Sequence, residues 1–393
     1  MFSNTFNTSD ELFAWLRSDA GGRLLVRDDE TSNYAIIYYN KATSNMSLPH
    51  VPLCRSVIWN KVTNKPAMMA PAYGRKFLQA VTDGVGGNGV TDFVVEDYVD
   101  GVMINMFYDP ISLEWRLATR TQLDATGNFF GKRSFAELFW ETFFSKGLTK
   151  DDLDVASTYS WVLQHPEERI VVAPVYGIPK LTLVQGPASS ALGMQGPATD
   201  RLQFFAPKTY DLKTLEDVKE FVTAEGRRLG SQWQGVCLKT QGGSDGACAI
   251  RYKLRSNQYD EIRHLRGNQA KLPYTWLERW SQGRLGAYLR MYPEEQCDAD
   301  AIIANFKTCT QELHTLYMRV YRKKEMPLGQ APQKYRKLLW DAHQAGKGAY
   351  FPDLRQFMNE QDTARKLWLV NYSQRYGQVP PMPQLLGLAP PVV

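Results

Sequence analysis

The sequence predicts an α+β fold in which antiparallel sheets come first and an all-helical domain follows. Short runs with the two-residue alternation of strands recur as far as residue 254, separated by polar and glycine-containing turns. From about Gln258 onward the apolar residues recur at helical spacing. One such helical face consists of Ile302, Ile303, Phe306, Cys309, Leu313, Leu316, Tyr317 and Val320. We therefore expect domains over residues 1–257 and 258–376, followed by a flexible, proline-rich tail over 377–393.

The individual elements follow from local patterns. A short helix is expected after Ser9-Asp10, which are good capping residues, and a second begins after the capping residue Thr214. Alternating apolar runs predict strands over 23–27, 34–39, 54–59, 114–120, 159–163, 169–173, 180–184, 235–240 and 248–254. Helical periodicity predicts further helices over 135–144, 335–345 and 353–376.

Composition narrows the class of protein. The 393 residues are 44% hydrophobic and 22% charged, which is typical of a soluble globular chain of two or three domains. The five cysteines and five histidines are scattered, so we expect no metal site and a reducing compartment. No apolar run approaches the ~20 residues that cross a membrane, and the N-terminus does not read as a signal peptide. We expect an intracellular protein whose net charge of +5 permits a nucleic-acid partner without requiring one.

The stretch from Val94 to Asp109, VVEDYVDGVMINMFYD, is the centre of the sequence. It alternates like a strand, breaks at Asp100-Gly101, and alternates again. An Asp-Gly pair between two alternating runs predicts a β-hairpin. In the first strand Glu96, Tyr98 and Asp100 share one face, because side chains repeat every two residues.

Five stretches together resemble the motifs of the covalent nucleotidyltransferases, the family of RNA ligases, DNA ligases and mRNA capping enzymes. Tyr98-Val99-Asp100-Gly101 resembles the family's first signature, Lys-x-Asp-Gly. The other four, in the family's order, are CRSVIW (54–59), SWVLQHPEERIV (160–171), QGVCLK (234–239) and RYKLRSNQY (251–259). The stretch SWVLQHPEERIV resembles the third signature of RNA ligase 1-type enzymes, and the helical part resembles RNA ligase homologues from large DNA viruses. The resemblance implies a nucleotidyltransferase domain, related in fold to ATP-grasp proteins, ahead of the helices.

The residues that perform catalysis in this family are changed here. The lysine that would attack the α-phosphate of ATP falls on Tyr98, and the two glutamates that would hold ribose and metal fall on Val162 and Gln234. A final lysine falls on Arg255, and no lysine lies between residues 77 and 131 that could replace the nucleophile. A phenol has a pKa of about 10, and neither valine nor glutamine supplies the anionic oxygens that magnesium prefers. The resemblance therefore implies no catalytic residue, no metal and no cofactor, with ATP and Mg²⁺ needed only if activity remains.

What remains of the expected cleft is mainly cationic and aromatic. Its cations could hold a phosphate-bearing ligand, and Tyr98 and Trp161 could stack a base. The competing interpretation is that these cations are paired or solvated, that Trp161 is a core residue and that Asp100 is a turn residue. The predicted ligand-binding residues are Arg55, Tyr98, Asp100, Gly101, Arg120, Trp161, Arg169, Gln234, Lys239, Lys253 and Arg255.

Three functions stay open. The first is an RNA-ligase-like protein that has lost adenylylation and binds RNA, a nucleotide or another protein, the last through its tail. The second is a divergent, active ATP-dependent RNA ligase that uses Tyr98, Lys239 or Lys253. The third is a viral structural or scaffold protein on a ligase fold. A viral source would place the protein in the host cytoplasm or in the virion.

Overall fold

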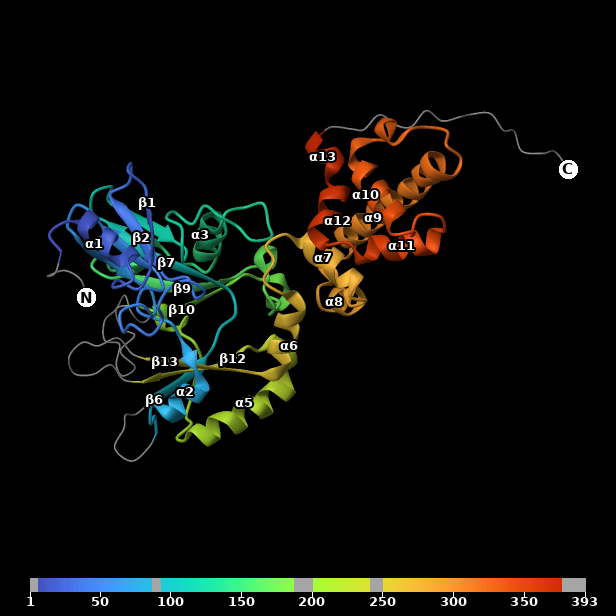
Figure 1. Cartoon of the computed structure of the whole chain (residues 1–393). Helices are drawn as coiled ribbons and strands as arrows, with labels where there is room; N and C mark the ends of the chain where they lie inside the picture. Colours follow the sequence, from blue (N-terminus) through green and yellow to red (C-terminus); the bar gives the residue numbers. More distant parts are fainter. Residues whose placement is uncertain (1–5, 87–92, 187–200, 241–249, 377–393) are drawn as a thin grey trace. The chain divides into compact units, whose positions relative to one another are not determined.

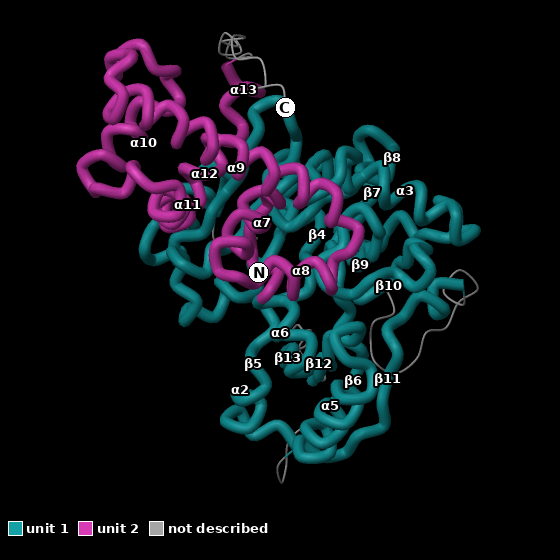
Figure 2. The backbone as a smooth tube through the Cα atoms, turned by 90° about the vertical axis from the view of Figure 1, so that its right-hand side faces the viewer, with its two compact units in different colours: residues 1–264 teal, residues 265–393 magenta. Residues whose placement is uncertain are grey.

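The computed structural model describes residues 6–86, 93–186, 201–240 and 250–376. The expected tail over 377–393 lies outside these ranges. The chain divides into two compact units, residues 1–264 (unit 1) and 265–393 (unit 2), coloured separately in Figure 2. Unit 1 contains the described strands in three sheets, in which every pair is antiparallel except β5 with β13. Unit 2 is helical. The predicted α+β class, antiparallel sheets followed by helices, is confirmed.

The first sheet of unit 1 is built from the N-terminal strands. Its order is β1 (Leu25–Asp28), β2 (Tyr34–Tyr38), β3 (Val57–Asn60) and β4 (Lys65–Met69). Helix α1 (Ser9–Arg17), whose N-cap is Thr8, packs Leu12, Phe13 and Leu16 onto one face. The opposite face joins a separate apolar cluster with Phe107.

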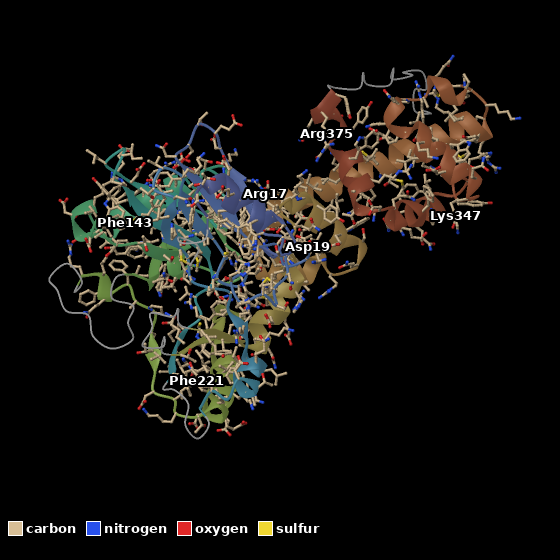
Figure 3. All side chains as sticks on the ribbon, turned by 60° about the vertical axis from the view of Figure 1, so that its left-hand side comes forward. Arg17, Asp19, Phe143, Phe221, Lys347 and Arg375 are labelled. Atoms are coloured by element: carbon tan, nitrogen blue, oxygen red, sulfur yellow. The ribbon has the colours of Figure 1, made fainter. Side chains whose placement is uncertain are left out.

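The second sheet has the order β10 (Lys180–Gln185), β9 (Tyr159–Gln164), β7 (Val102–Asp109) and β8 (Glu114–Ala118). The third has the order β11 (Thr209–Tyr210), β6 (Phe93–Asp97), β12 (Gly235–Thr240), β13 (Arg251–Arg255) and β5 (Arg75–Lys76). Helix α3 (Phe135–Ser145) packs on the second sheet, and α2 (Phe77–Thr82) and α5 (Leu215–Leu229) pack on the third (Figure 1). Phe143 of α3 and Phe221 of α5, labelled in Figure 3, therefore belong to two different apolar cores.

The predicted β-hairpin across Asp100-Gly101 is wrong. β6 pairs with β11 and β12, whereas β7 pairs with β8 and β9, so the chain passes from one sheet to another at this point. Gly101 has a φ of +146°, and a Cβ atom there would meet the carbonyl oxygen of Leu163 at 2.5 Å. The glycine thus serves a close backbone approach to β9. The alternation within β7 is as expected, because Val102, Ile104 and Met106 share one core and Phe107 lies in another.

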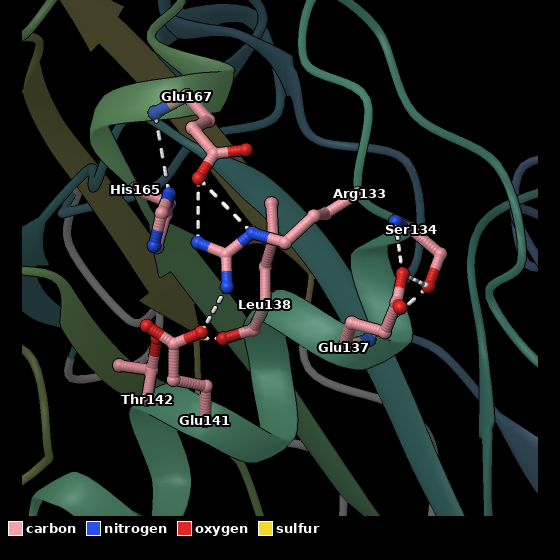
Figure 4. Close-up of polar contacts among 8 residues, drawn as sticks. All are labelled: Arg133, Ser134, Glu137, Leu138, Glu141, Thr142, His165 and Glu167. Atoms are coloured by element: carbon pink, nitrogen blue, oxygen red, sulfur yellow. Dashed lines mark hydrogen bonds and ion pairs between the residues drawn. The ribbon is translucent and has the colours of Figure 1, made fainter.

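The segment after β9 is not the strand that was predicted over 169–173. It begins with a short 3-10 turn, Pro166–Glu168, and is fixed by side-chain contacts. Arg133 forms ion pairs with Glu167 and with Glu141 of α3 (Figure 4). The buried Glu168 carboxylate accepts hydrogen bonds from three consecutive backbone N–H groups, those of residues 129–131, at 2.9–3.0 Å. These contacts satisfy the local backbone without a strand partner.

Helices make up unit 2. They are α7 (Leu272–Ser281), α8 (Leu285–Met291), α9 (Gln296–Tyr317), α10 (Gln333–Gln344), α11 (Phe351–Glu360), α12 (Thr363–Val370) and α13 (Tyr372–Tyr376), with α6 (Asn257–Arg266) leading into them. α9 is central, and its Phe306, Leu313 and Leu316 pack in one core with residues of α10, α11 and α12. The single helix predicted over 353–376 is divided, because Asp362 caps the start of α12 by accepting a hydrogen bond from the N–H of Ala364.

The close approach at Gly101 predicts a large loss of stability for Gly101→Ala. The added methyl group would meet Leu163 O at 2.5 Å and Val162 Cγ1 at 2.8 Å, in a backbone conformation that L residues rarely adopt. We expect the free energy of unfolding to fall by about 3 kcal/mol. Gly84→Ala is the matched control, since Gly84 has a φ of +74° but no atom of the described residues within 4 Å of its Cβ position, and should cost about 1 kcal/mol. Urea unfolding followed by tryptophan fluorescence measures both; equal losses would contradict the steric argument.

Candidate functional site

A cleft lies in unit 1 where the chain changes sheets. One wall comes from the second sheet through Met103, Val162 and Val184, and the other from the third sheet. The third-sheet and loop residues that line it include Glu96, Asp97, Tyr98, Gln234, Cys237, Arg251, Lys253 and Arg255, with Arg55 from the loop before β3 and Tyr259 and Arg263 from α6.

Asp100 lines this cleft and connects the segments around it through hydrogen bonds. It is 7% exposed, and its carboxylate accepts hydrogen bonds from the hydroxyl of Tyr259 at 2.6 Å and from the N–H groups of Val171 and Val172 at 3.0 and 2.9 Å. It therefore ties the sheet-to-sheet connection to α6 and to the segment after β9. Burial, and then the Asp100 carboxylate, raise the pKa of the Tyr259 hydroxyl far above its usual range. A carboxylate engaged in this way acts as a structural group.

Tyr98 lines the cleft and is held by its backbone and by an arginine. Its N–H donates to the carbonyl oxygen of Gly235 at 2.9 Å. The guanidinium group of Arg255 lies 5.3 Å from the centre of the Tyr98 ring, and one of its nitrogens is 3.4 Å from the phenol oxygen. The position that holds lysine in the family's signature thus carries an aromatic ring covered by a cation on one side.

The two positions at which the resemblance implies glutamates, Val162 and Gln234, also line the cleft. Val162 is 5% exposed and pairs with Met103 and Thr182 across β9. Gln234 is 6% exposed, and its side-chain oxygen has no hydrogen-bond partner in the described part of the chain. Burying an unpaired amide oxygen is costly. Gln234 therefore offers an acceptor that a ligand donor would satisfy.

Cations without counterions gather around these residues. Within the described ranges Lys41, Arg55, Lys253 and Arg263 form no ion pair. The ammonium groups of Lys41 and Lys253 both lie over the ring of Tyr73, 4.6 and 4.8 Å from its centre. Burial, and then the neighbouring positive charges, lower the pKa of Lys253 to about 8. The same two causes lower the pKa of Lys41. Burial also lowers the pKa of the Arg55 guanidinium.

One carboxylate of the cleft, Glu96, is neutralised within the protein. Its Oε1 is 2.6 Å from Nζ of Lys239 and 3.5 Å from a guanidinium nitrogen of Arg251. Lys239 also donates to the carbonyl oxygen of Val184 at 3.3 Å. Burial lowers the pKa of Lys239, and Glu96 opposes that shift. Asp97 is likewise engaged, because it accepts hydrogen bonds from the side chains of Tyr210 and Trp233 at 2.6 and 2.9 Å.

Four of the residues predicted to bind a ligand do not line the cleft. Lys239 is held by Glu96. The guanidinium of Arg120 donates to the carbonyl oxygen of Tyr39 at 2.5 Å, and that of Arg169 donates to the carbonyl oxygen of Val171 at 3.1 Å. Trp161 is fully buried in the core beside α3. The expectation that Trp161 stacks a base is therefore corrected, because its ring is enclosed by apolar side chains.

The other predicted residues are brought together: Arg55, Tyr98, Asp100, Gly101, Gln234, Lys253 and Arg255 all line the cleft. The prediction missed Arg251 and Arg263. Arg251 precedes Lys253 and Arg255 by steps of two on one strand, so alternation places it on the same face. Arg263 follows Tyr259 by four residues on α6 and so shares its helical face.

No protein-family model and no curated protein matches this chain. A protein from Aquifex aeolicus described as an ATP-dependent DNA ligase matches in structure with a TM-score of 0.39 and 12% identity, over 73% of this chain and 72% of that one. An archaeal ATP-dependent RNA ligase matches with a TM-score of 0.37 and 12% identity, over 94% of this chain and 87% of that one. A mutant of the Naegleria gruberi RNA ligase with AMP and Mn matches with a TM-score of 0.35 and 12% identity, over 49% of this chain and 57% of that one.

These structural neighbours are RNA and DNA ligases. Similarity at these scores assigns no activity to this chain. In the described residues no group of three or more His, Cys, Asp and Glu side chains is placed to hold a metal ion. None of the described helices is long and apolar enough to cross a membrane.

The Glu96–Lys239 contact predicts a strong coupling between these two residues. Lys239→Met would leave the buried Glu96 carboxylate with only the more distant Arg251, and we expect a loss of about 3 kcal/mol in the free energy of unfolding. The double variant Glu96→Gln, Lys239→Met removes both charges and should recover much of that loss. Urea unfolding of the two single variants and the double variant provides the cycle. Additive losses would mean that the pair does not stabilise the cleft wall.

Proposed function

We propose that this chain is an RNA-ligase-like protein that binds a nucleotide or a nucleic acid in its cleft without forming a covalent intermediate. The observation that carries the proposal is the imbalance of charge around Tyr98. Arg55, Lys253 and Arg263 line the cleft and form no ion pair with any residue that the structure describes, while the three carboxylates that line it are engaged with protein donors. Phosphate oxygens are the ligand groups that best match such an unpaired cluster.

The neighbouring groups fit the other parts of a nucleotide. The ring of Tyr98 offers a surface on which a base can stack. The unpartnered oxygen of Gln234 can accept a hydrogen bond from a hydroxyl or amino group. A divalent metal is not required, because the arginines and lysines already supply the positive charge that a metal would bring. The arrangement therefore favours metal-independent, non-covalent binding.

One observation favours the alternative of a divergent active enzyme. Lys253 faces the cleft with a pKa of about 8, so part of it is a neutral amine near neutral pH. In such an enzyme its Nζ would attack the α-phosphorus of ATP. A P–N bond would form, the bond to pyrophosphate would break, and the amine would release a proton. Lys239 is a poorer nucleophile because its ammonium group is held by Glu96.

Intact-mass spectrometry decides between these functions. The protein is incubated with ATP, and separately with GTP, in the presence of magnesium or manganese. We expect no covalent nucleotide adduct, because the nucleophile position holds Tyr98 and the expected metal ligands are absent. An adduct lost in Lys253→Met would establish the divergent enzyme instead. An adduct lost in Tyr98→Phe would make the phenol the nucleophile, and either result would overturn the proposal.

The charge of Lys253 predicts a pH-dependent affinity for ATP measured without metal. The folded-state pKa of about 8 means that the ammonium form is present below pH 8 and is lost as the pH rises through that value. We expect ATP binding to weaken by up to about tenfold between pH 7 and pH 9, as one favourable charge disappears. Isothermal titration calorimetry measures this.

Two variants serve as tests of that pH dependence. Lys253→Met should bind more weakly at pH 7 and change little between pH 7 and pH 9. Lys65→Met is the control, because Lys65 is exposed on β4 and does not line the cleft, and it should behave as the unmodified protein. A steep pH dependence that persists in Lys253→Met would show that another group titrates.

A further inference from the structure

A second groove adjoins the cleft on the far side of the sheet-to-sheet connection. Residues 97–100 and Gln234 line both spaces, so the two are continuous. The opposite wall of the groove is the segment from Val172 to Lys180, between β9 and β10, together with Lys146 at the end of α3. The function proposed for the cleft makes no use of this wall.

The wall presents apolar side chains to solvent. Val175 is 73% exposed, Tyr176 95% and Ile178 56%. Tyr176 also has a φ of +53°, a left-handed backbone conformation that is uncommon for a tyrosine. Such outliers persist only where the surrounding structure fixes them, and they gather at ligand-binding segments. The exposed ring of Tyr176 is therefore a candidate surface for contact with a ligand.

Hydrogen bonds fix the segment on both sides of Tyr176. At its start, the N–H groups of Val171 and Val172 donate to Asp100, and that of Ala173 donates to Oε1 of Gln232 at 3.0 Å. Within it, two tight turns are closed by the N–H groups of residues 177 and 178 at 3.0 Å. The ring of Tyr176 is therefore exposed on an ordered loop that is tied directly to the floor of the cleft.

The charge of the groove indicates what it would hold. Lys146 and Lys180 line it and form no ion pair in the part of the chain that the structure describes. Asp97 and Asp100 also line it, but both carboxylates are engaged with protein donors. An aromatic ring beside unpaired lysines, continuous with a cationic cleft, is the combination that single-stranded nucleic acids bind. An apolar peptide would use Tyr176 and its neighbours but would leave the lysines without a counter-charge.

We propose that this groove binds a single strand of nucleic acid whose end occupies the cleft. A base of the strand stacks on Tyr176, its phosphates contact Lys146 and Lys180, and the strand continues past residues 97–100 to the cations around Lys253. This inference rests on the function proposed for the cleft and deepens it, because it selects a single strand among the ligands that the cleft admits and assigns the adjoining groove to that strand.

Two ligands separate the groove from the cleft. Fluorescence anisotropy is measured with a labelled single-stranded RNA of about ten nucleotides, a length within the range of single-strand sites. ATP binding is measured in parallel by calorimetry. We expect Tyr176→Ala to weaken RNA binding about tenfold, which is typical of the loss of one stacked base, and to change ATP affinity by less than about twofold. Lys180→Ala should lower the salt dependence of RNA binding by about one counterion.

The matched control is Phe204→Ala, since Phe204 is 89% exposed in the same unit but does not line the groove. It should bind both ligands as the unmodified protein does. Equal RNA affinities for Tyr176→Ala and Phe204→Ala would contradict the proposal that the groove binds a strand, and would not affect the function proposed for the cleft. So would binding of ATP without binding of RNA, or an equal loss for both ligands in Tyr176→Ala. If the unmodified protein binds neither ligand, the proposed function itself fails.

Discussion

The architecture of unit 1 depends on one buried carboxylate and the glycine beside it. Asp100 collects donors from α6 and from the segment after β9, and Gly101 lets the chain pass within contact distance of β9. Because the chain changes sheets here, the side chains of both sheets face a common space. The cleft and the adjoining groove share this connection as a wall, so the geometry of both is set by the same few hydrogen bonds.

Some charged side chains of the cleft are paired within the protein and others are not. Glu96 is paired with Lys239 and Arg251, which shows that the fold can neutralise buried charge where stability requires it. In the described part of the chain Lys253 and Arg55 form no ion pair, and their lowered pKa values reflect above all the cost of burying their charges. Unfavourable electrostatics that the fold could have relieved locally are typical of sites that receive a ligand. The alternative, solvation of every cation by water, does not account for the unpartnered oxygen of Gln234 beside them.

Local sequence patterns predicted where strands and helices occur better than they predicted which strands pair with one another. The alternation that identifies β7, β9 and β12 lies in the sequence of each strand, whereas the pairing of Glu96 with Cys237 joins residues far apart in the chain. The Asp-Gly pair correctly predicts that the strand ends at this point. It does not determine whether the next strand pairs with the first, as in a hairpin, or belongs to another sheet. Trp161 was misplaced for a reason the sequence does contain. Val162 and Trp161 are adjacent on one strand, so only one of them can face the cleft.

The substitutions relative to the family's signature act together on the charge of the cleft. Tyrosine in place of lysine removes one positive charge, and Val162 and Gln234 in place of two glutamates remove two negative charges, so the net change is +2 − 1 = +1. The same changes withdraw the amine that would attack a phosphorus atom and the oxygens that would hold a metal ion. Relative to the resembled signature, a cleft with this charge would attract phosphate more strongly by electrostatics and would lack the groups that the signature uses for transfer. Under the proposed function, metal-free phosphate binding and the absence of adenylylation would both follow from the residue types at these three positions.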